Sequence, residues 1–308
     1  MKRILITGAT GFVGRRLLKS LDLLESEVCI LSRAINSDYK TIICDFEQDE
    51  VPLTALESID TVFHLAGFAH DMSNASKIKD LYYKINVNST IQLAKLAVQS
   101  GVKKFIFVSS VKAGGVAIPG KCLSENDQGE PEGVYGKTKR EAELKLLEIS
   151  QNSDMHVSIV RPSLVYGPGV KGNLKLMLSG IERGWFPPLP DVRNLRSMVH
   201  VDDLVRSILF VSNNKRANRE IFIVTDGTPY SSREIYKYMC KALKKRVPKW
   251  YVPFFIFSVI SYMNSSIRYR VNKLLGDECY SSKKLQSLGF KTHKSLENFN
   301  ETYKSFKE

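Results

Sequence analysis

The sequence predicts an α/β protein with a doubly wound parallel sheet and a smaller, mostly helical C-terminal lobe. Short apolar segments alternate with stretches of helical periodicity through the first half of the chain. This alternation is typical of βαβ units and therefore of a parallel sheet. The first apolar segment also runs into a turn with three glycines, and a helix-forming segment follows it. The second half is less regular, and residues 228–308 indicate helices joined by loops.

The expected strands are short apolar segments, and they occur at 4–6, 27–31, 41–44, 61–65, 104–108, 157–160, 198–201 and 221–224. The expected helices lie after residue 14, at 81–100, at 134–149 and from residue 202 onward. Ligands bind such sheets at the carboxyl ends of the strands. The glycine turn, 66–67, 109–110 and the segment after 160 should therefore meet at one crevice.

The glycine turn predicts a dinucleotide site. Gly8, Gly11 and Gly14 lie between an apolar strand and a helix start. A pyrophosphate binds the free N–H groups of a helix N-terminus, and its close approach requires residues without a Cβ. The spacing is G-x-x-G-x-x-G rather than the commoner G-x-G-x-x-G, and a glycine turn without a ligand is the alternative. We expect a Rossmann-type domain at 1–166, rejoined by 196–226, and a substrate lobe at 167–195 and 227–308.

Composition limits the partners. The chain has 308 residues, 43% hydrophobic and 25% charged, which is ordinary for a globular protein, but its net charge of +13 is not. Such a charge suits nucleic acid, a membrane surface or acidic small molecules. The basic residues are scattered, and the densest cluster, 241–246, resembles the exposed end of a helix. No nucleic-acid-binding motif accompanies the charge, so we expect no nucleic-acid partner.

The cysteines and apolar segments bear on location. The five cysteines are far apart and include no C-x-x-C, which argues against a disulfide framework or a zinc site and fits a reducing, cytoplasmic compartment. The first strand leaves no room for a signal peptide. The apolar run 251–263 is too short to span a bilayer. We expect a buried helix there and no integral membrane segment, with peripheral contact at the inner face of the membrane as the alternative.

Tyr135 and Lys139 are the first candidate catalytic residues. They are four residues apart at the start of an expected helix, so they share a face. A tyrosine that exchanges a proton near neutral pH needs a lowered pKa, and a nearby ammonium group lowers it. Ser110, at the end of the 104–108 strand, can donate a hydrogen bond to the same substrate oxygen. Solvent-facing helix residues are the alternative interpretation.

These motifs and five further segments occur in the order of a known family. The chain resembles the extended short-chain dehydrogenases/reductases of the nucleotide-sugar epimerase/dehydratase family. The matching segments are TGATGFVG at 7–14, VFHLAG at 62–67, Asn86 in KINVNST, FIFVSS at 105–110, YGKTK at 135–139, RPSLVYGPG at 161–169 and RSMVHVDDL at 196–204.

The resemblance implies roles for named residues. The catalytic set would be Ser110, Tyr135 and Lys139. The cofactor would contact Gly8, Thr10, Gly11, Phe12, Val13, Gly14, Ser32, Arg33, Asp45, Phe46, Leu65, Ala66, Gly67, Asn86, Tyr135, Lys139, Pro162 and Val165. The UDP-sugar substrate would contact Ser110, Lys112, Tyr135, Asn173 and Arg196. The family often forms homodimers through a helix pair, for which 81–100 and 134–149 are the candidates.

Four other residues suggest weaker hypotheses. His64 lies inside an apolar strand and is expected to be a packed core residue, and His200 is expected to be structural. His70 and Lys112 lie on loops near the predicted site and could touch substrate. No His, Asp or Glu set has metal-ligand spacing, so we expect no metal.

The end of the second strand bears on the form of the cofactor. A dinucleotide site usually has a carboxylate there, which holds the adenosine ribose. This chain has Ser32 followed by Arg33, which would accept a 2′-phosphate that a carboxylate repels. We therefore expect NADP(H) in preference to NAD(H). The alternative is that Arg33 is only a solvated strand end.

Resemblance to one subgroup of this family narrows the choice of expected reactions. The segments 109–115, 135–143, 167–173 and 189–204 are similar to a subgroup associated with UDP-4-keto-6-deoxy-N-acetylhexosamine reductases of surface-polysaccharide synthesis, which is also described as UDP-glucose 4-epimerase-like. The family's 4,6-dehydratases have Thr-Asp-Glu where this chain has Ser110-Val111-Lys112, so dehydration is disfavoured. We expect reduction at C4 of a keto-sugar, with a UDP-glucose or UDP-N-acetylglucosamine 4-epimerase as the alternative. A non-catalytic NADP-binding regulator is a remote alternative, because it would not need the proton-transfer set.

Overall fold

The computed structural model describes residues 2–24, 26–69, 75–131 and 133–298. Its main element is a seven-stranded parallel sheet with the strand order β3-β2-β1-β4-β5-β6-β9. This confirms the predicted doubly wound sheet. The strands are β1 (Arg3–Thr7), β2 (Glu27–Ser32), β3 (Lys40–Ile43), β4 (Thr61–His64), β5 (Lys104–Val108), β6 (His156–Pro162) and β9 (Glu220–Val224).

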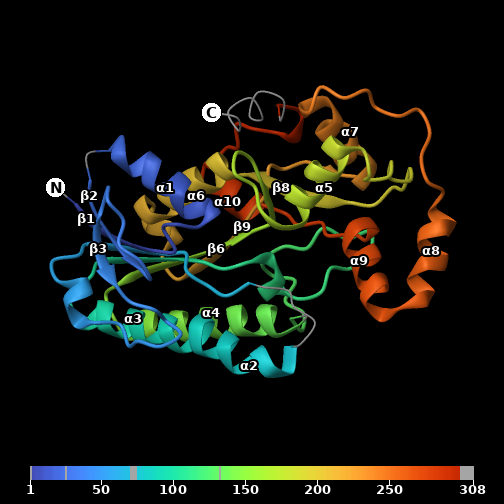
Figure 1. Ribbon diagram of the computed structural model, residues 1–308. Coiled ribbons are helices and arrows are strands. Elements are labelled where there is room, and N and C mark those ends of the chain that lie inside the picture. The colour runs from blue at the N-terminus through green and yellow to red at the C-terminus, as the bar shows by residue number, and fades with distance from the viewer. Residues whose placement is uncertain (1, 25, 70–74, 132, 299–308) are drawn as a thin grey trace.

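Helices cover both faces of this sheet (Figure 1). One face carries α1 (Phe12–Asp22), α6 (Val201–Asn213) and α10 (Lys283–Ser287), and the other carries α2 (Ala75–Tyr83), α3 (Ser89–Gln99) and α4 (Gly133–Gln151). Successive strand residues point to opposite faces. Ile4 and Ile6 of β1 accordingly pack in the core under α1 and α6, whereas Leu5 packs in the core under α3 and α4.

The expected helix at 81–100 is not continuous. Its α2 and α3 parts are joined by a π-helical turn at Lys84–Asn88. Such turns occur at functional sites because they change the direction of one side chain. The turn includes Asn86, which is buried and bonded to the backbone of Phe68.

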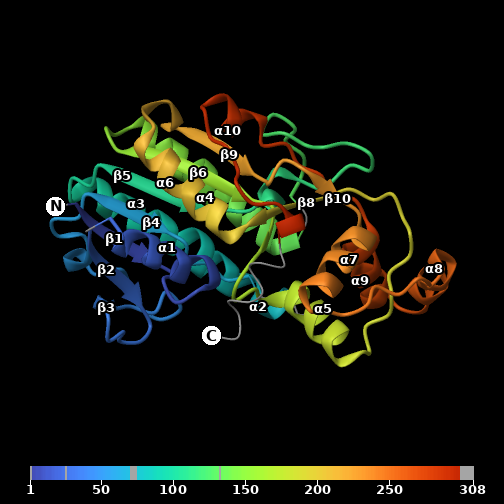
Figure 2. The same ribbon diagram turned by 90° about the horizontal axis from the view of Figure 1, so that it is seen from above.

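A smaller lobe lies beyond the carboxyl ends of the sheet (Figure 2). It contains a three-stranded sheet in the order β10-β8-β7. Its strands are β7 (Leu164–Tyr166), β8 (Arg196–His200) and β10 (Pro229–Tyr230), and its helices are α5 (Gly172–Arg183), α7 (Ser232–Ala242), α8 (Phe254–Met263) and α9 (Ser265–Leu275). After β8 the chain returns to the main sheet through α6 and β9. The division into two domains at residue 166 stays a prediction.

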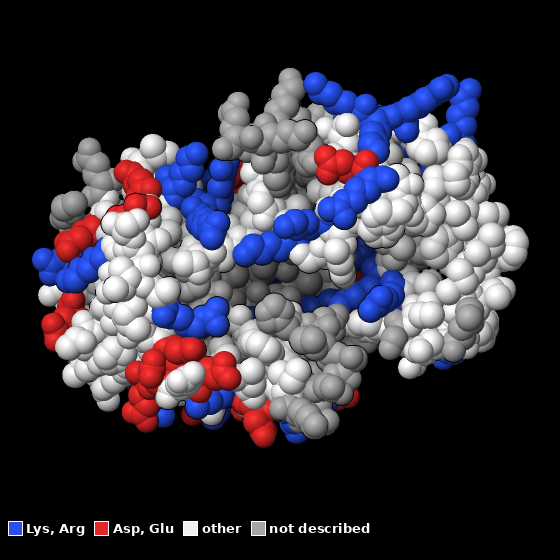
Figure 3. All heavy atoms as spheres, viewed as in Figure 1, with Lys and Arg blue, Asp and Glu red and all other residues white. Residues whose placement is uncertain are grey.

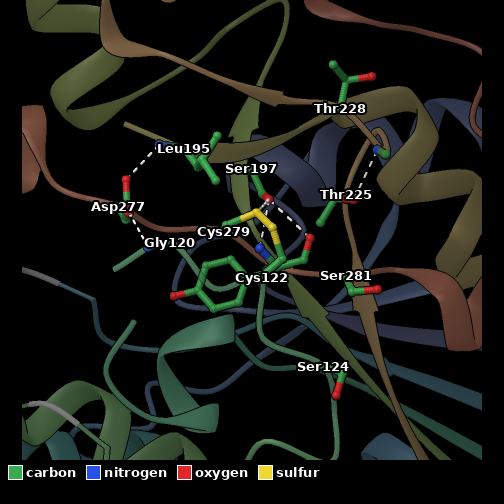
Figure 4. Close-up of a disulfide and its surroundings, with 12 residues drawn as sticks. Gly120, Cys122, Ser124, Leu195, Ser197, Thr225, Thr228, Asp277, Cys279 and Ser281 are labelled. Carbon is green, nitrogen blue, oxygen red and sulfur yellow. Dashed lines mark hydrogen bonds between the residues drawn. A yellow bond between two sulfur atoms is a disulfide. The ribbon is translucent and has the colours of Figure 1, made fainter. Parts of the chain in front are cut away.

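The structure corrects the expectation that the cysteines form no disulfide. Cys122 and Cys279 are bonded to each other although 157 residues separate them (Figure 4). Beside the bridge, the Leu123 N–H donates to the Cys279 carbonyl at 2.9 Å, and the Leu123 carbonyl accepts from the Ser281 N–H at 2.8 Å. This pairing brings the two cysteines together, and it has no signature in their spacing along the chain.

This disulfide predicts a specific thiol count. Alkylation of the unfolded, unreduced protein should label Cys29, Cys44 and Cys240 only, and prior reduction should raise the label to all five cysteines. Because the bridge closes a long loop, its reduction should lower the free energy of unfolding by up to about 5 kcal/mol. Mass spectrometry and urea unfolding measure the two effects. Five labelled thiols before reduction would contradict the bridge.

The structure also corrects the expectation of a buried helix in the run 251–263. Among the described side chains of α8, none is buried. The helix packs against α9, and only Phe257 among its aromatic side chains packs against the core of the lobe. In both Figure 1 and Figure 2, α8 lies at the outer edge of the lobe. Within the described residues, no helix combines the length and the apolar character that crossing a membrane requires.

Candidate active site

The glycine turn lies where β1, β4 and α1 meet. Gly8 has a φ of +71°, and a Cβ there would lie 2.6 Å from the Ala66 nitrogen. A Cβ on Gly14 would lie 2.2 Å from the Gly8 carbonyl oxygen. Gly11 is the N-cap of α1 and provides no side-chain cap, and no acidic residue follows in the first turn. The helix N-terminus is therefore open to an anion.

The loop after β4 forms the neighbouring wall. The Ala66 N–H donates to the Thr7 hydroxyl at 3.2 Å. Asn86 accepts from the Phe68 N–H at 2.7 Å and donates to the Thr138 hydroxyl at 3.1 Å. Asn86 thus joins this loop to α4, and its predicted contact with the cofactor stays a prediction. A Cβ on Gly67 would lie 3.3 Å from the Lys139 Nζ.

Ser110, Tyr135 and Lys139 come together at the carboxyl end of β5. Ser110 caps the short helix at 111–114, where its hydroxyl accepts from the Lys112 N–H at 3.3 Å. The Tyr135 hydroxyl is hydrogen-bonded to the Ser110 side chain. Lys139 donates to the Val108 carbonyl at 2.9 Å. The strand end and the first turns of α4 therefore hold a hydroxyl pair beside a buried ammonium group.

The pKa values of this set differ from the sequence expectation. Burial raises the pKa of Tyr135 to about 12, and the hydrogen bond from Ser110 opposes this rise. The expectation that Lys139 lowers the pKa of Tyr135 towards neutrality stays a prediction. Burial lowers the pKa of Lys139 to about 8, against the attraction of Glu143. Tyr135 therefore keeps its proton at neutral pH unless nearby positive charge stabilises the phenolate.

Lys139 predicts a pH dependence of stability. Its pKa is 10.5 when unperturbed and about 8 in the fold, so between these values the unfolded chain binds more protons. The free energy of unfolding should therefore rise with pH across this window, by up to about 3 kcal/mol. Urea unfolding of the nucleotide-free protein measures this rise against Lys139→Met, which lacks the proton. Identical pH profiles would contradict the prediction.

A buried ion pair fixes the helix that carries Tyr135 and Lys139. Arg161 of β6 donates to both carboxylate oxygens of Glu143 on α4, at 2.9 and 2.5 Å. Both side chains are fully buried. Removal of one partner from such a pair costs about 3–5 kcal/mol because the other charge stays buried. The pair therefore sets the position of α4 relative to the strand ends.

The residues predicted to hold the adenosine end lie after β2 and β3. Arg33 is exposed, and the Ser32 hydroxyl accepts a long bond from the Ala34 N–H at 3.4 Å. Asp45 accepts from the Glu47 N–H at 3.0 Å, which orders the loop. Phe46 is buried and its ring contacts His64, so its side chain belongs to the core. The roles of these four residues stay predictions.

The residues predicted to hold the substrate diphosphate lie in the lobe. Asn173 is exposed in the first turn of α5, and this helix has no side-chain N-cap bond. Arg196 is buried and donates to Glu278 at 3.1 Å and to the Lys273 carbonyl at 2.6 Å. Lys112 also pairs with Glu278. Burial raises the pKa of Glu278, but Arg196 and Lys112 outweigh it, and the pKa is lowered.

Glu278 is a site residue that the sequence reasoning missed. It lies in a segment with no helix or strand signal, and the disulfide at Cys279 holds it. Its carboxylate neutralises the two cations that we predicted to face substrate. Tyr82 is a second site residue that the sequence reasoning missed. Its ring lies edge-on to the Tyr135 ring, with 6.5 Å between the ring centres. Only its place in the helix next to Asn86 could have indicated it.

The predicted histidines have structural surroundings. His64 is fully buried and bonds Thr7 at 2.6 Å and Thr90 at 2.8 Å. Burial lowers its pKa to about 3. His200 caps α6 through its ring nitrogen. His70 lies outside the described residues. Among the residues that the structure describes, no group of three or more His, Cys, Asp or Glu could hold a metal.

The site fits a dinucleotide. The glycine turn is packed so closely that a Cβ on Gly8 or Gly14 would clash with backbone atoms. The buried Ser109 hydroxyl has no hydrogen-bond partner within the described ranges, a costly arrangement unless a ligand provides one. Phe12 and Val13 are half-buried beside the turn, as are Pro162 and Val165 at β6 and β7. Figure 3 shows this face hollowed near its middle, with Lys and Arg on the rim.

Comparison with known proteins identifies the family to which this chain belongs. Residues 4–224 match the NAD dependent epimerase/dehydratase family. The chain belongs to this family. It is 36% identical over 263 residues to the UDP-glucose 4-epimerase of Vibrio cholerae, covering 82% of this chain and 78% of that protein. This family member therefore has the extended short-chain dehydrogenase/reductase fold that the motifs predicted, and its relatives are NAD-dependent nucleotide-sugar enzymes.

Other similarities are more distant. The chain is 28% identical over 304 residues to the N-acetyl-alpha-D-glucosaminyl-diphospho-ditrans,octacis-undecaprenol 4-epimerase of Escherichia coli O157:H7, covering 93% of this chain and 89% of that one. A solved structure of MoeE5 with UDP-glucose and NAD superposes with a TM-score of 0.80 at 24% identity, covering 99% and 98% of the two chains. The UDP-N-acetylglucosamine 4-epimerase of Bacillus cereus has a TM-score of 0.79 at 18% identity, covering both chains fully. These two structures support the fold.

Proposed function

We propose that this family member is a 4-epimerase of a UDP-hexose or UDP-N-acetylhexosamine. The observation that carries the proposal is the Tyr135–Ser110 hydrogen bond at the strand end, with Lys139 buried behind it. The residues after Ser110 also suit this chemistry better than dehydration. Val111 is buried, and Lys112 is paired with Glu278, so neither is an acid that could remove water. The similarity to the Vibrio 4-epimerase supports the same reaction.

The roles of the residues follow from their positions. In its phenolate form, Tyr135 takes the proton of the C4 hydroxyl as the C4–H bond breaks, and it returns this proton to the C4 oxygen when that bond re-forms on the other face of the ring. Ser110 orients the same oxygen through its hydroxyl. Lys139 provides positive charge beside Tyr135, which favours the phenolate. A bound nicotinamide would supply the hydride acceptor and donor for C4.

A second candidate is the 4-keto reductase that the sequence analysis favoured. Its support is the absence of a carboxylate at the end of β2, where Ser32 and Arg33 would accept the 2′-phosphate of NADP(H). A reductase exchanges its cofactor in each turnover, whereas a 4-epimerase can retain it. The two candidates therefore differ in what the purified protein carries.

The bound nucleotide distinguishes the candidates. The protein is purified without added cofactor and denatured, and the released nucleotide is identified by mass spectrometry. Stoichiometric NAD supports the 4-epimerase and contradicts the NADP(H) preference. An empty protein that binds NADPH more tightly than NADH supports the reductase. The matched control is Gly14→Ala, in which the new Cβ would clash with the Gly8 carbonyl oxygen and displace the start of α1.

We further propose a homodimer and a place in the cytoplasm, at the inner face of the membrane, in surface-polysaccharide synthesis. The exposed Leu144 on α4 supports a dimer through α3 and α4. A disulfide is unusual in a reducing compartment. The number of free thiols in this protein, counted in freshly lysed and alkylated cells, therefore tests the proposed cytoplasmic location. Light scattering of the full chain tests the dimer, and a monomer would contradict it.

A further inference from the structure

The outer side of the α8–α9 hairpin exposes large apolar side chains. We call this surface the α8 face. Monomeric proteins rarely expose a contiguous apolar patch of this kind without a function. The most exposed members are Phe254 at 52%, Phe255 at 65%, Val259 at 60% and Tyr262 at 80%, and Trp250 at 63% precedes the helix.

The segment that contains the α8 face is rich in Lys and Arg. Residues 235–276 contain nine Lys and Arg and no Asp or Glu, within a chain whose net charge is +13. This segment therefore carries a net charge of +9, and Arg268, Arg270 and Lys273 lie on α9, which packs against α8. Figure 3 shows the right-hand end of this view as uncharged, with Lys and Arg above it.

Aromatic and basic side chains border the α8 face in pairs. The Arg268 guanidinium lies 5.8 Å from the centre of the Tyr262 ring. The Lys273 ammonium lies 4.6 Å from the centre of the Tyr269 ring. An apolar centre bordered by Trp, Tyr, Lys and Arg is the composition of helices that lie in the lipid–water interface.

We propose that the α8 face binds a bilayer containing anionic phospholipid. Its apolar side chains would enter the region between headgroups and acyl chains, and the surrounding cations would contact the phosphates. With ten residues, α8 is too short to cross the bilayer. The chain would therefore lie on the membrane and not span it.

The charge also argues against two other occupants. A second copy of this chain would place two strongly positive borders against each other, whereas an anionic surface neutralises them. Nucleic acid would neutralise the charge but would leave the apolar centre without a partner. A lipid surface satisfies both features together.

The α8 face is close in the chain to the candidate substrate site. The carbonyl oxygens of Lys273 in the last turn of α9 and of Gly276 directly after it accept from Arg196 at 2.6 and 3.2 Å. A bilayer on this face would therefore lie beside the lobe that is predicted to hold the diphosphate. The proposal itself does not depend on the reaction, because lipid binding needs no substrate.

Co-sedimentation with vesicles tests the proposal. The full-length protein is mixed with vesicles of phosphatidylcholine, with or without about one-third phosphatidylglycerol. We expect binding to the anionic vesicles only, and weaker binding at high salt. The double variant Phe255→Ser/Val259→Ser should bind at least tenfold more weakly, and so should Arg268→Gln/Lys273→Gln.

The matched control is Leu23→Ser/Leu24→Ser. These two leucines are 83% and 59% exposed and follow α1 at the opposite end of the molecule. Their replacement should leave vesicle binding unchanged. Two results would overturn the proposal. One is no vesicle binding by the unaltered protein, and the other is a dimer that dissociates in the Phe255→Ser/Val259→Ser variant, which would make the α8 face a self-association surface.

Discussion

Replacement of Tyr135 by Phe should lower kcat by at least about 100-fold, because the variant cannot exchange a proton with the C4 oxygen. The ring and its edge-on contact with Tyr82 remain, so the fold and the affinity for nucleotide should change little. Steady-state kinetics with UDP-glucose or UDP-N-acetylglucosamine measures the effect. The expected pattern is a loss in kcat with a nearly unchanged KM.

The matched control for this variant is Tyr238→Phe. This variant also loses only a hydroxyl, which in the unaltered protein donates to Glu297 at 3.3 Å on the lobe surface. The activity of the Tyr238→Phe protein should equal that of the unaltered protein. A Tyr135→Phe protein with full biological activity would contradict the proposed catalytic set. That result would instead favour a non-catalytic nucleotide-binding protein.

Replacement of Gly14 by Ala should remove most of the nucleotide affinity. On helix propensity alone this change would stabilise α1 by about 1 kcal/mol. The new Cβ, however, would lie 2.2 Å from the Gly8 carbonyl oxygen and 2.7 Å from the Ala9 Cα. Both are backbone atoms, so the start of α1 must move away from the turn. We expect at least a tenfold rise in the Kd for the nucleotide and a loss of about 1–3 kcal/mol of stability.

Gly129→Ala is the matched control. Its Cβ would lie 3.6 Å from the nearest atom, the Gly115 Cα, which is an ordinary contact. Isothermal titration with NAD and NADPH compares the two variants with the unaltered protein. Unchanged affinity in Gly14→Ala would mean that the pyrophosphate does not bind at this turn.

The sequence was sufficient to predict the strands of the sheet and the strand ends that carry the candidate site. The strands that were predicted from apolar segments all belong to one parallel sheet or to the small sheet of the lobe, because a strand buried on both faces is apolar throughout. The carboxyl ends of β1, β4 and β5 follow from this topology. Ser110 and Tyr135 were therefore predictable as neighbours from resemblance and strand order together.

Three features depended on packing that the sequence does not encode locally. The partners of Cys122 and Cys279 are 157 residues apart, and spacing alone cannot pair them. The pKa of Tyr135 follows its burial, which only the fold determines. The helix at 254–263 is apolar on all sides, so its periodicity does not distinguish a core helix from one exposed to another phase.

One measurement tests the central proposal most directly. UDP-glucose and UDP-N-acetylglucosamine are incubated with the purified protein and no added nucleotide, and the sugar signals are followed by NMR. The account predicts conversion of at least one of them to its C4 epimer, and no conversion with Tyr135→Phe. No conversion of either sugar, together with turnover of a UDP-4-keto-hexose that requires NADPH, would contradict the 4-epimerase and identify a reductase.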